Sequence, residues 1–205
     1  MTVYGLTGKT GAGKSTVAAF LKEKGFYIID GDVIARHITD KGKPALKALS
    51  DYFGEDIIRA DGTLDRRLLA SRAFASPVNT DMLNCITHPI ITEEFEQEIK
   101  KAEAEGYDKA VIDAAALLES ECKKLCSQII VVFAPEEMRL KRILSRDGIT
   151  EGEAKRRMSA QKSDEYYFSQ ADIIVKSFPP HNIEEQLESI LDERKPQLEI
   201  KGNYD

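Results

Sequence analysis

The chain has 205 residues, of which 42% are hydrophobic and 31% are charged. This length and composition are typical of one large globular domain and exclude a disordered chain, a collagen and a low-complexity filament. The formal net charge is −6, from 29 basic and 35 acidic residues. A net acidic chain is a poor candidate for non-specific nucleic-acid binding, so any bound anion requires a local basic site.

No signal peptide or membrane-spanning segment is visible in the sequence. The apolar runs are short, such as residues 129–134, far below the roughly 20 residues needed to span a bilayer. The chain enters a strand-like segment at once, with no basic start followed by a long apolar stretch. The cysteines, Cys85, Cys122 and Cys126, are odd in number and sparse, which fits a reducing compartment. We therefore expect a cytoplasmic protein with no membrane partner and no nucleic-acid partner.

Short apolar segments rich in β-branched residues recur along the chain. They predict strands at residues 3–7, 26–29, 107–114, 128–133 and 171–175. Continuous runs without polar alternation indicate strands that are covered on both faces. Because helical patterns separate these segments, we expect βαβ units and an α/β fold with a mostly parallel sheet.

Amphipathic spacing predicts the helices between these strands. We expect them at residues 15–24, 44–53, 64–74, 80–104, 135–146 and 183–191. Pro135 suits the first position of its helix, and Thr150 with Glu153 forms a capping-box pattern that opens a further helix. No strand is evident between residues 41 and 106, so this region is expected to be a helical insertion that covers one edge of the sheet.

A glycine-rich motif follows the first predicted strand and opens the first predicted helix. The segment Gly8-Lys9-Thr10-Gly11-Ala12-Gly13-Lys14-Ser15 matches G-x-x-x-x-G-K-[ST]. Such a loop wraps phosphate oxygens with backbone N–H groups, while the lysine contacts the β- and γ-phosphates and the hydroxyl of Ser15 binds Mg²⁺. A dinucleotide fingerprint is rejected, because Thr16 occupies the position of its third glycine.

Carboxylates follow the second and third predicted strands. Asp30 and Asp32 end the second strand, on the side of the sheet where ligands of α/β proteins bind. Asp32 is a candidate general base for an attacking hydroxyl; the alternative is that it only caps the helix that starts near Val33. Asp113 ends the third strand, where its carboxylate can reach Mg²⁺ through water.

A basic segment lies within this acidic chain. Residues 138–162 hold eight basic and three acidic side chains, a local net charge of +5. Arginines here can stabilise charge on a transferring phosphoryl group, and Arg142 and Arg146 are the best candidates. For Lys141, Lys155 and Arg156 a solvated helix face is the better explanation.

The order of these motifs resembles the dephospho-CoA kinase family. The resemblance is carried by residues 8–16, 29–36, 53–54, 61–66, 83–90, 113–119, 139–150, 157–161 and 171–172. It implies a P-loop kinase fold with a parallel five-stranded sheet, a helical substrate-binding insertion and a lid. It also implies ATP-dependent phosphorylation of the ribose 3′-hydroxyl of dephospho-CoA, which yields coenzyme A and ADP in the last step of coenzyme A biosynthesis.

The resemblance also implies a division of the chain and a set of site residues. One domain would have a core (residues 1–40, 107–137 and 168–195), a helical acceptor region (41–106), a lid (138–167) and a tail (196–205). The catalytic residues would be Asp32, Lys14 and Arg142. ATP would be bound by Gly8, Gly11, Ala12, Gly13, Lys14, Ser15, Thr16, Arg142 and Arg146. The acceptor would be bound by Asp32, Arg66, His88 and Glu119. Apart from the resemblance, the modest apolar faces of the predicted helices suit a monomer.

This chain departs from the family pattern at two places. Ala115-Ala116 stands where a Pro-Leu pair is usual, and Ser177 stands where an asparagine is usual. Other hypotheses remain open. A small-metabolite kinase of the shikimate or gluconate type also has an Asp-x-Asp pair after its second strand, but the long helical insertion favours a larger acceptor. A nucleotide-gated binding module would not need a base at Asp32.

Overall fold

The computed structural model describes residues 1–191, so the expected tail at residues 196–205 lies outside the described part. Five strands form one sheet in the order β2-β3-β1-β4-β5, and every pairing is parallel. The strands span Thr2–Gly8 (β1), Tyr27–Asp30 (β2), Lys109–Asp113 (β3), Gln128–Phe133 (β4) and Ile173–Lys176 (β5). The predicted parallel five-stranded sheet is therefore confirmed.

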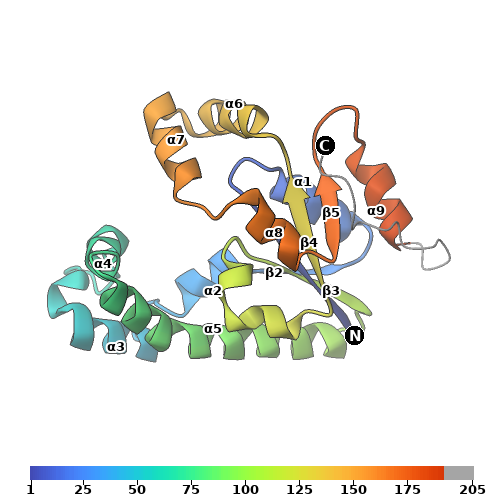
Figure 1. The fold of residues 1–205 in the computed structure, drawn as a ribbon. Coiled ribbons are helices and arrows are strands. Elements are labelled where there is room, and N and C mark those ends of the chain that lie inside the picture. The colour runs from blue at the N-terminus through green and yellow to red at the C-terminus, as the bar shows by residue number, and fades with distance from the viewer. Residues whose placement is uncertain (192–205) are drawn as a thin grey trace.

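Helices cover both faces of this sheet (Figure 1). They span Lys14–Glu23 (α1), Gly31–His37 (α2), Pro44–Phe53 (α3), Arg66–Ala73 (α4), Pro77–Ala104 (α5), Glu136–Asp147 (α6), Glu151–Ser159 (α7), Asp164–Gln170 (α8) and Ile183–Leu191 (α9). Short 3-10 helices lie at Glu55–Ile57 (η1), Leu117–Glu119 (η2) and Glu121–Leu125 (η3).

Two hydrophobic clusters pack against the two faces of the sheet. On one face, Leu21 of α1 and Leu187 of α9 are fully buried against strand residues such as Val111. On the other face, Phe95 of α5 and Tyr167 of α8 pack with strand residues. Because both faces are covered, the strands lack the alternation of apolar and polar residues that a half-exposed sheet shows.

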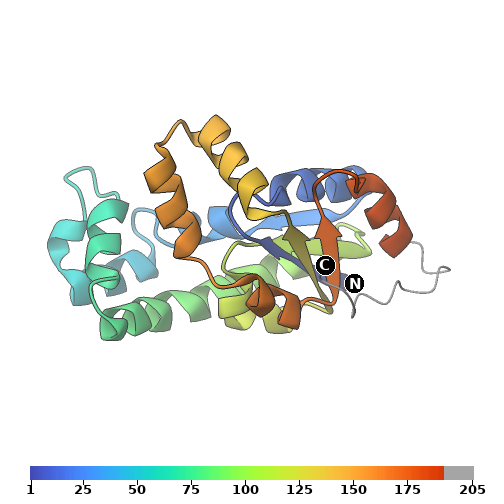
Figure 2. The ribbon, with the colours of Figure 1, turned by 45° about the horizontal axis from the view of Figure 1, so that its top comes forward.

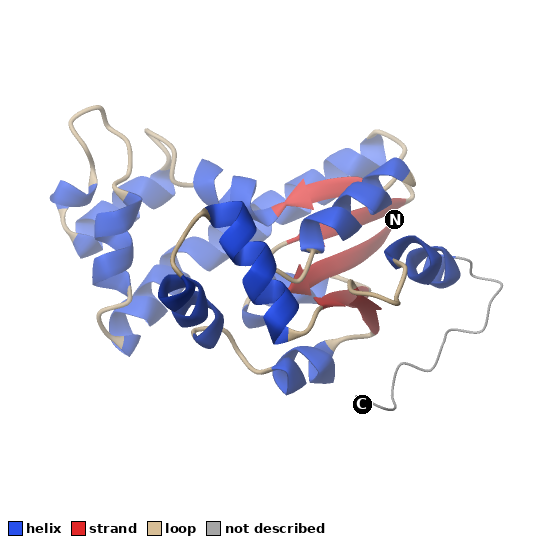
Figure 3. Cartoon of the chain, turned by 90° about the horizontal axis from the view of Figure 1, so that it is seen from above, coloured by secondary structure: helices blue, strands red, loops and turns tan. Residues whose placement is uncertain are grey.

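The region between β2 and β3 forms a separate helical unit at one end of the molecule. Its own core joins α3, η1 and α4, with Leu49, Ile57 and Leu69 buried, and the first half of α5 packs on it. Figures 1 and 2 place α3 and α4 at one end and α9 at the other, and Figure 3 shows the sheet from above among the helices that cover it. An isolated antiparallel bridge pairs Ile58 with Leu64, a contact that the sequence did not indicate.

Helix α5 links the helical unit to the sheet. It runs for 28 residues and contains Pro89, and Ser76 caps its first turn by accepting a hydrogen bond from the backbone N–H of Asn79. Its second half buries Phe95 and Ala102 under the sheet. The expected helix began at residue 80, so the structure extends it by three residues to the proline that opens it, a favoured first position.

Helices α6 and α7 form a smaller packed pair beyond the end of β4. Ile143, Ala154 and Met158 are buried between them. The predicted capping box at Thr150 and Glu153 is present in both directions. Pro135 is the N-cap residue of α6 and lies one position before the place predicted for it. Within the described residues, no helix is long and apolar enough to cross a membrane.

Candidate functional site

The glycine-rich loop joins β1 to α1 in the conformation that a phosphate site requires. Gly13 is the N-cap of α1 in the left-handed region, with φ of 97°, and no side chain caps the helix. The first backbone N–H groups of α1 are therefore left to a ligand, and the positive end of the helix dipole favours an anion there.

The start of α6 packs closely against the loop at Gly11. Gly11 has φ of +77°, and a Cβ atom there would lie 2.7 Å from the backbone oxygen of Arg139. A side chain at this position would be strained and would push the loop away from α6. The glycine at this position thus allows the close contact between loop and helix.

Lys14 and Asp113 form an ion pair at the carboxyl ends of the central strands. Burial raises the pKa of Asp113; Lys14 opposes this rise, and the nearby carboxylates Asp30 and Asp32 add to it. The three acids therefore concentrate negative charge beside the lysine that the motif assigns to phosphate.

The structure assigns different tasks to Asp30 and Asp32. Asp30 is the N-cap of α2, and one of its carboxylate oxygens accepts hydrogen bonds from the N–H groups of Asp32 (2.9 Å) and Val33 (3.1 Å). The hypothesis that Asp32 caps this helix is therefore wrong, because the helix begins at Gly31. Asp32 lies exposed in the first turn, and within the described residues its carboxylate has no hydrogen-bond partner.

A cavity of about 920 Å³ lies in front of the loop. Its lining includes most of the predicted site residues: Gly8, Gly11, Ala12, Gly13, Lys14, Ser15, Thr16, Asp32, Arg142 and Arg146. Its size lies within the range of small-molecule sites. Among the described residues, Asp32 is the only carboxylate in the lining. It shares the cavity with five basic side chains of the loop and α6: Lys9, Lys14, Lys141, Arg142 and Arg146.

Arg142 joins the loop to the end of β5. Its guanidinium donates to the backbone oxygens of Gly11 (3.2 Å) and Ala12 (3.3 Å) and to the hydroxyl of Ser177 (3.1 Å), and it also contacts the backbone oxygen of Ser177. Ser177 in turn donates its hydroxyl hydrogen to the oxygen of Ala12. The serine that replaces the usual asparagine thus ties the phosphate loop to β5, a role that the sequence did not reveal.

Arg146 is engaged differently. It pairs with its neighbour Asp147 at 2.7 Å, and Arg157 of α7 also contacts that carboxylate at 2.5 Å. These arginines hold the pKa of Asp147 below its ordinary value. Lys155 pairs with Glu151 on an exposed face of α7, in line with the expected solvated face. Arg146 still lines the cavity and remains mostly exposed.

Gln161, which lies between α7 and α8, and Asp164, the first residue of α8, also contact the phosphate loop. Gln161 accepts a hydrogen bond from the N–H of Thr10 at 2.9 Å, and Asp164 pairs with Lys9 at 2.8 Å. Sequence analysis did not predict these two contacts. No local pattern marks them, because more than 150 residues separate each pair along the chain.

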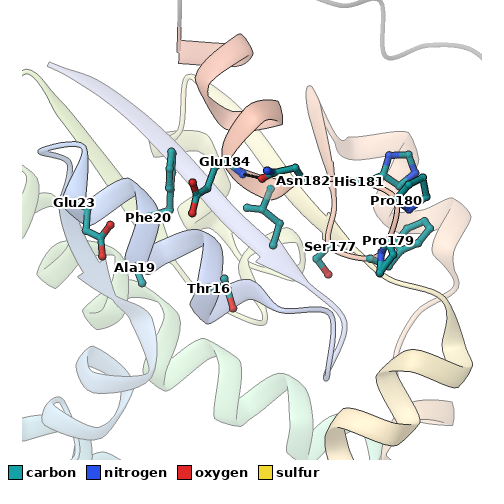
Figure 4. Close-up of a pocket in the computed structure, with 12 residues that line it drawn as sticks. Thr16, Ala19, Phe20, Glu23, Ser177, Pro179, Pro180, His181, Asn182 and Glu184 are labelled. Carbon is teal, nitrogen blue, oxygen red and sulfur yellow. Dashed lines mark hydrogen bonds between the residues drawn. The ribbon is translucent and has the colours of Figure 1, made fainter.

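A second cavity, of about 650 Å³, adjoins the first along α1. Figure 4 shows Thr16 and Phe20 of α1 on one side and the segment with Ser177, Pro179 and His181 on the other. The two cavities share Thr16, Ser177 and Ile183 in their linings, so they lie side by side. A ligand with phosphates on the loop can therefore extend an aromatic group toward Phe20.

Three predicted acceptor residues lie outside the lining of the loop cavity. Arg66 opens α4, His88 lies in α5 before Pro89, and Glu119 is exposed at the end of η2. Of the alanine pair at 115–116, Ala115 lines the loop cavity, so this departure from the family pattern does lie at the site. Within residues 1–191, no group of three His, Cys, Asp or Glu side chains is arranged to hold a metal by itself.

Comparison with known proteins agrees with this geometry. The family model described as dephospho-CoA kinase matches residues 2–178. A dephospho-CoA kinase from Corynebacterium efficiens is 42% identical over 194 residues, covering 94% of this chain and 97% of the relative. One from Corynebacterium glutamicum is 43% identical, covering 85% and 88%.

Solved structures share the fold. TT1252 from Thermus thermophilus has a TM-score of 0.80 at 26% identity and covers 95% of this chain and 98% of its own. A dephospho-CoA kinase from Campylobacter jejuni has a TM-score of 0.60 at 24% identity, covering 94% and 96%. A shikimate kinase from Acinetobacter baumannii has a TM-score of 0.51 at 15% identity, covering 93% and 91%, and shares the fold alone. On the match of the family model and of its relatives, the chain belongs to the dephospho-CoA kinase family.

Proposed function

We propose that this protein transfers the γ-phosphoryl group of ATP to the ribose 3′-hydroxyl of dephospho-CoA, giving coenzyme A and ADP. One observation carries the mechanism: Asp32 lines the loop cavity with a carboxylate that is not used as a helix cap. The long helical unit, with its own core, supports an acceptor larger than shikimate or gluconate.

Asp32 is the general base in this proposal. A ribose hydroxyl is a weak nucleophile, so a positioned carboxylate that accepts its proton assists the attack on phosphorus. The O–H bond breaks, the new O–P bond forms, and the bond from the γ-phosphorus to the bridging oxygen of ADP breaks. The proton passes to Asp32.

The loop and the lysine stabilise the charge that develops on phosphate. The backbone N–H groups at the start of α1 and the ammonium group of Lys14 contact the β- and γ-phosphates. Lys14 must exchange its contact with Asp113 for the phosphates when ATP binds. Arg142 holds the shape of the loop, and Arg146 at the cavity rim adds positive charge. The neighbouring second cavity receives the base of ATP beside Phe20.

The residues at this site fit a magnesium ion. Mg²⁺ is usually bound by one or two carboxylates or hydroxyls together with water and substrate phosphates. Ser15 lines the cavity, and Asp113 carries a raised pKa among neighbouring carboxylates, a charge density that a divalent cation relieves. In this proposal Ser15 would hold the ion directly and Asp113 would hold it through water. When bound, the ion neutralises charge on the β- and γ-phosphates.

The remaining assignments belong to the same proposal. Residues 41–106 bind the acceptor, with Arg66, His88 and Glu119 on its side, and residues 138–167 act as a lid. Gln161 and Asp164 contact the loop, which supports a lid whose position is linked to the phosphate site. The protein acts as a monomer.

A coupled assay of ADP release tests the function. The panel holds ATP and Mg²⁺ with dephospho-CoA, shikimate, gluconate or no acceptor. Of the acceptors tested, we expect only dephospho-CoA to give rapid release of ADP. Mass spectrometry should then show one added phosphate on dephospho-CoA. Equal release without any acceptor would indicate an NTPase, and a preference for shikimate or gluconate would replace the proposed substrate.

A further inference from the structure

The amide side chain of Gln161 lines the loop cavity and uses only one of its two polar groups within the protein. Its oxygen Oε1 accepts a hydrogen bond from the backbone N–H of Thr10 at 2.9 Å. Because a backbone N–H can only donate, this bond decides which end of the amide faces the loop. Within the described residues, the NH2 group of the amide (Nε2) has no hydrogen-bond partner. The side chain therefore offers an oriented donor at the wall of this cavity.

The backbone on both sides of Gln161 is held by packed helices. Its N–H donates to the backbone oxygen of Met158 at 3.2 Å, which continues the last turn of α7, and Met158 is buried between α6 and α7. Three residues after Gln161, Asp164 opens α8 and pairs with Lys9 of the loop at 2.8 Å. The side chain of Lys9 is only 13% exposed, so water screens this ion pair only in part. The position of Gln161 thus depends on several contacts and not on its own hydrogen bond alone.

The neighbouring cations of the site already have partners within the protein. Arg142 donates to backbone oxygens of the loop, and Arg146 pairs with an adjacent aspartate. Lys14 must leave Asp113 before it contacts a phosphate. The free NH2 group of Gln161 has no such contact to break. A donor that is oriented in advance costs no reorganisation when charge develops on a ligand.

The place of Gln161 along the two neighbouring cavities selects the terminal phosphate. In the proposed function, the base of ATP lies beside Phe20 in the second cavity. Thr10 and Gln161 line the loop cavity but not the second cavity. The same holds for Asp32, which accepts the proton of the attacking hydroxyl in that proposal. Since the γ-phosphoryl group is the part of ATP farthest from the base, it is the group that comes nearest to Gln161.

We infer that Gln161 is a further catalytic residue, which donates a hydrogen bond from Nε2 to an outer oxygen of the γ-phosphoryl group. The inference rests on the proposed function for the identity of the nucleotide. During transfer, negative charge is spread over the three outer oxygens of this group, and the loop and Lys14 supply donors to them. The amide adds a donor from the end of α7. It also favours binding of the triphosphate over the diphosphate product, which lacks the contacted group.

Two substitutions separate this donor from the contact with Thr10. Gln161→Glu keeps an oxygen that can accept from the N–H of Thr10 and replaces the NH2 group with a second oxygen. Gln161→Ala removes both polar groups and adds no charge. Gln97→Glu is the matched control, because it makes the same chemical change at an exposed residue of α5 that does not line the cavity.

The test compares binding of ADP with binding of a non-hydrolysable ATP analogue. Both dissociation constants are measured by calorimetry in the presence of Mg²⁺, and kcat is measured with ATP and dephospho-CoA. We expect both Gln161 variants to weaken binding of the analogue relative to ADP by about tenfold, the effect of losing a hydrogen bond to a charged group. We expect kcat to fall by about 10²-fold, as when one donor to a developing oxyanion is removed. Gln97→Glu should leave all three values near wild type.

A role confined to holding Thr10 gives a different result. Gln161→Glu would then match wild type, and Gln161→Ala would weaken binding of ADP and of the analogue equally. Either result overturns the inference. The ratio of the two dissociation constants is measured without an acceptor. If the wild type does not phosphorylate dephospho-CoA, the proposed function fails, while this ratio still decides whether Gln161 contacts the γ-phosphoryl group.

Discussion

Replacing Asp32 with asparagine separates a kinase from a protein that only binds nucleotide. The substitution keeps the size of the side chain and removes its basicity. Asp30, rather than Asp32, caps α2, so the hydrogen bonds that start the helix stay intact in the variant. The change therefore acts on the proton transfer and leaves the local fold in place.

The expected loss of catalytic rate in this variant is much larger, in free energy, than the expected loss of folding stability. General-base catalysis contributes roughly 10²–10⁴-fold, and a hundredfold loss corresponds to about 2.7 kcal/mol at about 1.36 kcal/mol per tenfold. Loss of a negative charge in the first helical turn costs about 0.3–1 kcal/mol of folding free energy. In a chain of this size that lowers the thermal midpoint by at most about 4 °C.

Single-turnover transfer from ATP to dephospho-CoA measures the loss of rate, and thermal unfolding measures the loss of stability. Calorimetry measures ATP binding beside them. We expect kcat to fall by about 10²-fold or more with ATP binding nearly unchanged. Asp30→Ala is the matched control, because loss of the N-cap should cost about 0.5–2 kcal/mol of stability. A wild-type transfer rate in Asp32→Asn would refute the base assignment and make Asp30 the next candidate.

Three further predictions concern the phosphate site. Lys14→Ala should lower turnover by about 10²–10³-fold with the fold intact, and near-normal turnover with an unchanged KM for ATP would remove Lys14 from the mechanism. Arg142→Ala should raise KM for ATP and lower the thermal midpoint more than Arg146→Ala does, because only Arg142 donates hydrogen bonds to the loop and to Ser177. Lys155→Ala should change neither value. Equal effects of the two arginine variants would contradict the role of Arg142 in holding the loop. Asp113→Asn should raise the thermal midpoint at pH 7 while lowering activity. Burial raises the pKa of Asp113 in the folded state, so the ionised carboxylate destabilises the fold at pH values above its ordinary pKa of 3.8. The gain in thermal midpoint from Asp113→Asn should therefore shrink as the pH falls toward 3.8. A lower midpoint of the variant at pH 7 would contradict this reasoning.

The features predicted from sequence are those set by neighbouring residues. The phosphate loop is contiguous, so its glycines, Lys14 and Ser15 could be assigned from spacing alone. The β-branched runs and the capping box at Thr150 were likewise visible, because hydrophobic periodicity and helix capping act over a few residues. The family resemblance supplied the acceptor, since its motifs are spread along the chain in a fixed order.

Tertiary packing decided what spacing could not. From the sequence, Asp32 could be a base or only a helix cap, and only the backbone geometry shows that Asp30 caps α2 and that Asp32 does not. Ser177 and Arg142 contact the loop across 130 residues or more, and Gln161 and Asp164 do so across more than 150. A basic cavity beside Thr39 likewise joins two stretches of chain, residues 39–41 and 59–67. Such contacts depend on the order of strands in the sheet and on how helices pack over its edge, which no local pattern encodes.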